Sequence, residues 1–222
     1  MSVAEQTNSP APQRPVRAEP PPPAEFRRPT SAFVREIIET LLLTFFIFWL
    51  VNGLVGRYRI DGNSMNPTLL NGEYLLISNF AYQLDEPQRG DIIVFRHPQS
   101  EMNLIKRVIG LPGDHVTCDG KGPIKVNGVA IAEPYLKPGN APSTMAFDIH
   151  VPAGKVWVMG DHRSDSADSR WHPVGGDGSQ GSVPIDKITG RAVLLVWPLD
   201  RWTGLGQPTE VFAKVPNPAV TP

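Results

Sequence analysis

The sequence predicts a mainly β protein, in which a coiled β-sheet domain follows one N-terminal transmembrane helix. One long apolar run, residues 37–55, is the observation that predicts the helix. After residue 57 the chain changes to short β-rich runs separated by Gly, Pro and Asn, with no helical segment of comparable strength. The 222 residues, 41% of them hydrophobic, suffice for one domain with its own core and for extensions.

The first element is a polar tail. Residues 1–30 are rich in Pro, Ala, Gln and Glu and include the run Pro20–Pro23. Such a segment buries too little apolar surface to offset the entropy of ordering. We predict a disordered, proline-rich tail over residues 1–30.

The second element is the apolar run itself, which predicts a transmembrane anchor over residues 36–56. A helix over Ile37–Val55 covers about 30 Å, close to the thickness of a bilayer core. A buried core helix is the alternative, but the run is apolar on all faces and lacks a stripe at the helical period. A cleavable signal peptide is a further alternative, and the long tail and the missing small-x-small cleavage site argue against it.

The orientation of this anchor follows from the charges beside it. Arg27, Arg28 and Arg35 lie on its N-terminal side. Positive charge is retained in the cytoplasm, so we expect a cytoplasmic tail and an extracytoplasmic domain over residues 57–222. The localisation predicted is the cell membrane, with a single pass.

The β-domain is predicted from eight short runs with strand character, and Asn127–Gly128 between two of them is typical of a hairpin turn. The runs are Tyr74–Ser78, Asp91–Phe95, Leu104–Ile109, His115–Cys118, Ile124–Val126, Val129–Ile131, Val156–Met159 and Ala192–Trp197.

Composition argues against several kinds of partner. With 21 basic and 22 acidic residues the net charge is −1, which does not suggest nucleic acid. The single cysteine, Cys118, allows no intramolecular disulfide. The five histidines are scattered, so we expect no metal site and no cofactor.

Four segments carry the candidate catalytic and site-supporting residues. Two of them place Ser64 in a tight turn preceded by glycine and Lys106 in a strand of alternating apolar character, and another is a polar loop with paired charges. The segments are Ile60–Leu69, Gly90–Phe95, Leu104–Asp114 and Met159–Arg170.

In this order, behind a membrane anchor, the four segments resemble the conserved boxes of the type I signal peptidases (bacterial leader peptidases). The resemblance extends from the anchor to about Trp197, and the third and fourth segments together are its specific part. It implies a membrane-anchored serine endopeptidase that uses a Ser/Lys dyad to remove N-terminal signal peptides from exported preproteins. Its substrates would carry small residues before the cut.

The resemblance makes Ser64 the nucleophile and Lys106 the general base. A serine hydroxyl is a weak nucleophile until a neighbouring base takes its proton. Lysine titrates at about pH 10.4, so it can act as that base only if burial lowers its pKa. The apolar neighbours Ile105 and Val108 fit a buried position, whereas an exposed strand lysine is the alternative from the residues alone.

The resemblance also implies supporting roles for five residues. Ser166 matches a hydroxyl that hydrogen-bonds the catalytic lysine. Asp168 and Arg170 match a charge pair that shapes the site, and Asp161 matches the partner of Arg107. A solvated charged turn is the alternative interpretation of this loop.

Three features depart from the family pattern. His162 and Ser164 stand where the family has Asn and Asp, which bears on loop geometry. A glycine-rich insertion occupies residues 175–181 and is expected to be flexible.

His162 beside Asp161 invites a Ser-His-Asp interpretation. We reject it, because two adjacent residues of a chain do not place the imidazole of one against the carboxylate of the other in a useful geometry.

Substrate contacts are implied by the same resemblance. Ser64 and Gly62 are the residues expected at the oxyanion. Gly62 replaces a serine that in some members helps to hold the oxyanion, so the backbone N–H of Ser64 is expected to carry more of this work beside a second donor that the sequence does not identify. A shallow apolar groove for the signal peptide would be lined by Met65, Leu69, Leu104 and Ile105. Trp197 and Trp202 are expected either in the core or on lipid headgroups.

Two rival functions remain. A self-cleaving regulator of the SOS repressor type shares the Gly-x-Ser-Met turn and the Ser/Lys chemistry, but it should carry a DNA-binding helical domain where this chain has a tail and an apolar helix. A catalytically inactive, membrane-tethered binding module is the second rival, and the presence of both Ser64 and Lys106 argues against it.

Overall fold

The computed structural model describes residues 30–97, 102–171 and 181–218. The predicted tail, apart from Thr30, and the glycine-rich insertion, apart from Gly181, lie outside the described residues. The predictions for these two segments therefore stay predictions.

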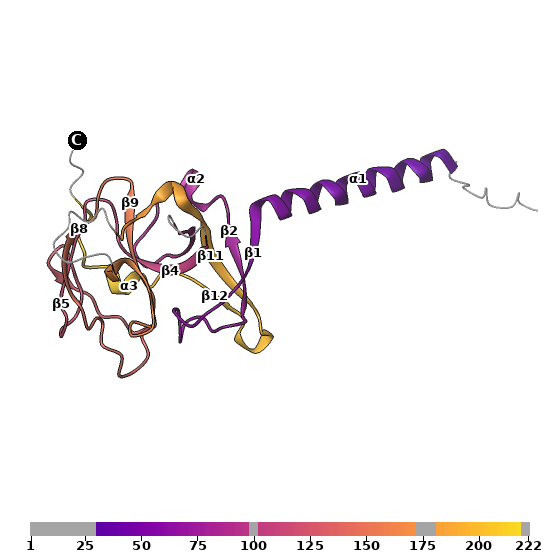
Figure 1. The fold of residues 1–222 in the computed structure, drawn as a ribbon. Coiled ribbons are helices and arrows are strands. Elements are labelled where there is room, and N and C mark those ends of the chain that lie inside the picture. The colour runs from indigo at the N-terminus through magenta and orange to yellow at the C-terminus, as the bar shows by residue number, and fades with distance from the viewer. Residues whose placement is uncertain (1–29, 98–101, 172–180, 219–222) are drawn as a thin grey trace, which may run out of the picture. The chain divides into compact units, whose positions relative to one another are not determined.

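The N-terminal element is helix α1, Thr30–Leu54 (Figure 1). It is long and apolar enough to cross a membrane, by length and composition, and its large apolar side chains from Phe33 to Trp49 are exposed. The predicted span, residues 36–56, ends later than the observed helix, which stops at Leu54. The reason is that Val55 and Gly56 already pair with strand β2. A Cβ at Gly56 would collide with the side chain of Ile77 on that strand, which explains the glycine.

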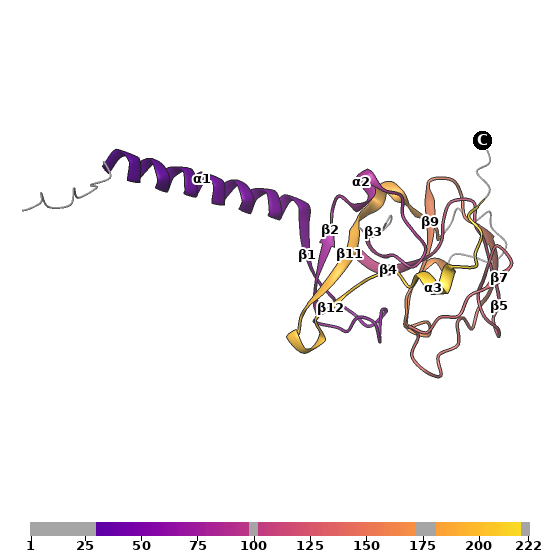
Figure 2. The same ribbon diagram turned by 180° about the vertical axis from the view of Figure 1, so that it is seen from behind.

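The rest of the described chain is mainly β, as predicted, and its larger sheet is antiparallel with the strand order β1-β2-β11-β3-β4-β9-β10, where β12 pairs with β11 (Figures 1 and 2). Its strands are β1 Val55–Arg59, β2 Tyr74–Ser78, β3 Ile92–Arg96, β4 Asn103–Gly110, β9 Lys155–Met159, β10 Val183–Pro184, β11 Ile188–Trp197 and β12 Thr203–Gly204.

The smaller sheet has the order β7-β6-β5-β8. Its strands are β5 His115–Asp119, β6 Lys125–Val126, β7 Val129–Ala130 and β8 Ala146–His150. The hairpin predicted at Asn127–Gly128 is confirmed: both residues have positive φ, 50° and 81°, as the turn between β6 and β7 requires.

Helices in the described part of the β-domain are short, as expected: α2 Ala81–Leu84, α3 Thr209–Phe212 and the 3-10 turns η1 Ser169–Trp171, η2 Ile185–Lys187 and η3 Leu199–Arg201. The eight predicted strands all form. Four others, β1, β8, β10 and β12, were not predicted, because they are short, mixed in polarity or contiguous with the apolar helix.

The core of the described β-domain lies in three clusters, one of which joins the two sheets. One joins the inner face of the small sheet to Ile109, Trp157 and Met159 of the large sheet and to α3. A second packs β1, β2, β3 and β11 around Met65 and Leu69. The turn that carries Ser64 is therefore anchored in the core at both of these side chains.

Candidate active site

Ser64 lies in a compact turn between β1 and β2. The N–H of Asn66 donates to the carbonyl of Asn63 at 3.0 Å, and the N–H of Leu69 donates to that of Met65 at 2.9 Å. The carbonyl of Ser64 accepts a bond from the N–H of His162 at 2.9 Å. The turn is thus fixed to the core on one side and to the loop 160–170 on the other.

Lys106 lies in the middle of β4, opposite Ile93 of β3, and only 3% of it is exposed. Its Nζ lies 2.8 Å from Ser64 Oγ and 3.0 Å from the carbonyl oxygen of Ile105. Burial lowers the pKa of Lys106 to about 8, against the opposing effect of the carboxylates of Asp168 and Asp161. A serine hydroxyl therefore meets an amine that loses its proton far more readily than an ordinary lysine, which is the arrangement a nucleophile and its base require.

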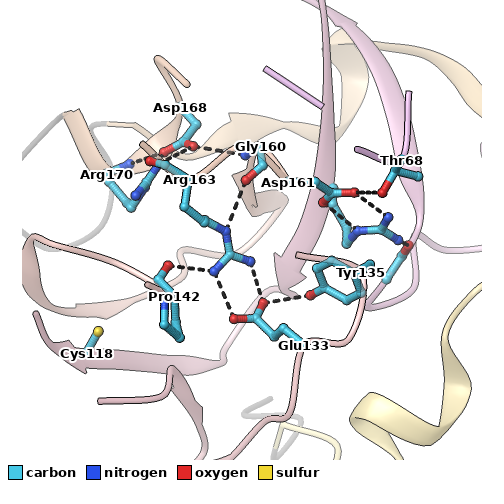
Figure 3. A network of polar contacts seen from close by, with 12 residues as sticks. Thr68, Cys118, Glu133, Tyr135, Pro142, Gly160, Asp161, Arg163, Asp168 and Arg170 are labelled. Atoms are coloured by element: carbon cyan, nitrogen blue, oxygen red, sulfur yellow. Dashed lines mark hydrogen bonds and ion pairs between the residues drawn. The ribbon is translucent and has the colours of Figure 1, made fainter. Parts of the chain in front are cut away.

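Arg107, the next residue of β4, is paired with Asp161. Its Nε donates to Oδ1 at 2.8 Å and its Nη2 to Oδ2 at 2.6 Å, and both side chains are buried. Asp161 Oδ2 also accepts a bond from Thr68 Oγ1 at 2.5 Å (Figure 3). The pair expected from the sequence is present, and it connects β4 to the Ser64 turn.

The second expected pair, Asp168 with Arg170, is present as well. Arg170 Nε and Nη2 each donate to the carboxylate of Asp168 at 2.8 Å. The N–H of Gly160 donates to the same carboxylate at 2.9 Å, and Arg170 Nη2 donates to the carbonyl of Arg163 at 2.8 Å. The pair thus closes the loop 160–170 on itself (Figure 3).

Ser166 differs from the expectation. Its Oγ is buried and has no hydrogen-bond partner among the described residues, so the bond to Lys106 is not formed in this structure. The hydroxyl packs against Gly160, where a Cβ would collide with Ser166 Oγ and with the carbonyl oxygen of Ser64. Glycine at position 160 thus allows Ser166 to approach the backbone of the Ser64 turn.

Gly62 also differs from its expected role. It has a φ of 115°, which explains the glycine, but its N–H donates to Asn71 Oδ1 at 3.0 Å. An amide already bonded in this way does not serve as the second oxyanion donor.

The four expected groove residues differ in exposure. Met65 and Leu69 are fully buried in the core, because the turn uses them as anchors, and their side chains do not reach a surface. Ile105 is buried and Leu104 is half-buried.

The side chain of His162 takes no place in a triad. Its Nδ1 lies 3.3 Å from the carbonyl oxygen of Asn63 and 3.7 Å from Asp165 Oδ2. Both carboxylate oxygens of Asp161 are bonded to Arg107, and one of them also to Thr68. The rejection of a Ser-His-Asp arrangement agrees with this geometry.

Sequence reasoning missed the residues that surround these pairs, namely Thr68, Glu133, Tyr135 and Arg163. Their sequence neighbourhoods do not distinguish them from surface polar residues. Trp197 and Trp202 are exposed, at 54% and 61%, so the core alternative for them is wrong. In the described part of the chain no group of three or more His, Cys, Asp or Glu side chains could hold a metal ion.

Comparisons with known proteins give one consistent match. The family model described as signal peptidase, peptidase S26, matches residues 33–197. Signal peptidase I of Mycobacterium tuberculosis (strain ATCC 25618 / H37Rv) is 32% identical over 222 residues, covering 76% of this chain and 74% of the relative. Signal peptidase I of Leptolyngbya laminosa is 34% identical over 215 residues, covering 93% and 98%. A crystal structure of a signal peptidase I from Enterococcus faecalis V583 aligns with a TM-score of 0.39 and 31% identity, over 48% of this chain and 97% of that one.

Proposed function

The chain belongs to the signal peptidase family, peptidase S26, and from this premise we propose that it removes signal peptides from exported preproteins with Ser64 as nucleophile and Lys106 as general base. The observation that carries the proposal is the 2.8 Å contact between Lys106 Nζ and Ser64 Oγ, together with the lowered pKa of the buried amine. No observation favours the self-cleaving regulator.

The proposed reaction is acyl transfer through an ester. The neutral amine of Lys106 takes the hydroxyl proton of Ser64 as Oγ attacks the carbonyl carbon of the last signal-peptide residue. The backbone N–H of Ser64 stabilises the oxyanion of the tetrahedral intermediate. The Lys106 ammonium then gives its proton to the leaving amine of the mature protein, and the neutral amine activates the water that hydrolyses the ester.

The proposed substrate groove uses residues of the Ser64 turn and of β4. Leu104 is half-buried and provides apolar surface, and Ile105 lies beside it. Met65 and Leu69 pack with Ile105 in one core cluster. Leu104 packs against a different cluster, because consecutive residues of a strand point to opposite faces. We propose that Leu104 provides the floor of a shallow groove, which accepts small side chains before the cut and excludes large ones.

The membrane is the proposed location. Helix α1 is the single-pass anchor, with the arginine-flanked N-terminus in the cytoplasm and the peptidase domain, residues 57–222, outside. The exposed Trp197, Leu199 and Trp202 are proposed to contact lipid at the headgroup level, where amphipathic indole rings are favoured. Neither a cofactor nor a nucleic acid takes part in this proposal.

The decisive experiment measures cleavage of a purified preprotein in detergent by the wild type and by Ser64→Ala. We expect cleavage at the signal-peptide junction by the wild type and none by Ser64→Ala. Cleavage of the chain itself, with the preprotein left intact, would support the regulator and contradict the proposal.

The orientation has its own test. Protease added outside spheroplasts should digest the β-domain and leave the anchor and tail protected. Digestion of the tail from outside, with the domain protected, would reverse the proposed topology.

A further inference from the structure

The loop that follows β7 in the small sheet extends into the neighbourhood of the proposed dyad. It carries Glu133 and Tyr135, which contact residues of the loop 160–170 and of β4 (Figure 3). We propose that Glu133 and Tyr135 are positioning residues for the reaction: they hold the loop 160–170 and Arg107 in place, and thereby keep Lys106 dry and directed at Ser64. This inference rests on the proposed Ser/Lys function.

The contact of Glu133 is with Arg163. Arg163 Nη1 donates to Glu133 Oε2 at 2.8 Å and Nη2 donates to Oε1, and both side chains are 2% exposed. The same guanidinium donates from Nη1 to the carbonyl of Pro142 at 2.6 Å and from Nε to that of Gly160 at 3.0 Å. Arg163 is thus bonded to the small-sheet side of the domain through Glu133 and Pro142, and to the loop of the site through Gly160.

The contact of Tyr135 is with Arg107. The Cζ atom of Arg107 lies 4.1 Å from the centre of the Tyr135 ring, which is a cation–π arrangement. The hydroxyl of Tyr135 donates to Glu133 Oε1 at 2.7 Å, so the two residues of the loop support each other. Arg107 follows Lys106 directly in β4, and its bonds to Asp161 continue to Thr68 in the Ser64 turn. One connected set of contacts therefore reaches from the small sheet to both members of the proposed dyad.

Charge explains why this set depends on Glu133. Arg163 and Arg107 are two buried cations, and the charge of Arg163 disfavours that of Arg107. Each needs its own carboxylate, Glu133 for one and Asp161 for the other. A buried charge that loses its partner is strongly unfavourable, so loss of the Glu133 carboxylate favours an opened loop 160–170 that admits water.

Water in the site would act on Lys106 in two ways. Hydration would raise the pKa of its amine toward the ordinary value, because burial is the main cause that lowers it. The carboxylates of Asp168 and Asp161 already raise this pKa in the intact site, so burial alone keeps it low. Loss of the fixed loop would also disturb the alignment of Nζ with Ser64 Oγ, and small misplacements of reacting groups cost large factors in rate.

The test compares Glu133→Gln with Asp114→Asn in the full chain in detergent. Asp114 is the matched control, because it forms a buried two-bond pair with Arg89 and is not part of the proposed dyad or of the contacts described for it. For Glu133→Gln we expect a fall in kcat of about tenfold or more with KM within about twofold, and a kcat-pH profile whose rising limb lies at higher pH. Asp114→Asn should lower Tm but leave kcat and the profile of the folded protein unchanged.

The pair Tyr135→Phe and Tyr135→Leu keeps the inference testable if Glu133→Gln does not fold. Phenylalanine retains the ring over Arg107, and leucine removes it. Tyr135→Phe should therefore keep most of the wild-type kcat, whereas Tyr135→Leu should lose it. Three results would each overturn the positioning role. The first is a wild-type kcat and pH profile in Glu133→Gln, and the second is an equal kcat in the two Tyr135 variants. The third is a loss of kcat in Asp114→Asn as large as that in Glu133→Gln. Failure of the dyad itself gives a different result, because Ser64→Ala would then still cleave.

Discussion

Two buried arginine–aspartate pairs of nearly the same geometry lie in different parts of the β-domain. Arg107 with Asp161 and Arg89 with Asp114 each form two hydrogen bonds of 2.6 to 2.8 Å, and both pairs are almost fully buried. What differs is their surroundings. The first pair follows Lys106 in β4 and bonds the Ser64 turn through Thr68.

The second pair connects chain segments that carry none of the proposed catalytic residues. Asp114 also accepts bonds from the N–H of Leu111 and from Asn127 Nδ2, and Arg89 donates to the carbonyl of Pro216. It therefore fixes the β6–β7 hairpin and the C-terminal segment. The geometry of a buried ion pair therefore does not reveal its role, because the role depends on which residues the pair fixes in position.

The first region also contains a buried cation that forms no ion pair with the described residues, Lys106, and removing it should give the largest effect. Lys106→Met should abolish cleavage and yet stabilise the protein at pH 7. The folded-state pKa of about 8 lies below the ordinary 10.5, a difference worth about 3 kcal/mol against folding while the lysine is charged in both states. This penalty is complete below pH 8, shrinks between pH 8 and 10.5, and vanishes above.

The measurement is the Tm of the wild type and Lys106→Met in detergent from pH 6 to 11. We expect Lys106→Met to melt about 5 to 10 °C higher at low pH and the two curves to converge above pH 10. A Tm difference that does not depend on pH would show that the charge of Lys106 is not the cause.

The direct test of the comparison exchanges one carboxylate in each pair. Asp161→Asn and Asp114→Asn should both lose stability, on the order of 3 to 5 kcal/mol, because each leaves a buried arginine without its charged partner. Only Asp161→Asn should lower kcat, by about a hundredfold, when activity is measured well below the Tm of both variants. Equal kcat values in the two variants would remove the distinction between the pairs.

A smaller effect is expected at Ser166. Its hydroxyl is buried and unpartnered among the described residues, so Ser166→Ala should not lower Tm. We predict that kcat falls about tenfold with the rising limb of the pH profile retained, because the hydroxyl can orient the neutral amine during the reaction. Wild-type kcat in Ser166→Ala would exclude this hydroxyl from the reaction.

The sequence predicted the β-domain well because its strands are short apolar runs between strong turn residues. The hairpin at Asn127–Gly128 shows why, since only a few residue types accept positive φ at both positions. The pairing of Arg107 with Asp161 came from resemblance, since 54 residues separate the two in the chain. The pairing of Glu133 with Arg163 could not be predicted from the sequence, because a charged residue looks the same in the sequence whether it is buried in an ion pair or exposed to solvent.

The smallest effect is predicted for His162, the residue that in sequence suggested another mechanism. What His162 contributes to the Ser64 turn is its backbone N–H, which alanine retains. Its side chain is 24% exposed and bonds no residue of the proposed dyad among those described. His162→Ala should therefore keep kcat within about threefold of the wild type and keep the rising limb of kcat/KM near pH 8, where Lys106 loses its proton. A mechanism that used an imidazole base would place that limb at about pH 6.5 and lose it in His162→Ala.

Lys106→Arg supplies the control, because a guanidinium stays protonated and should give no cleavage at any pH. Persistence of the limb in His162→Ala, with Lys106→Arg inactive throughout, is the result that the Ser/Lys mechanism requires.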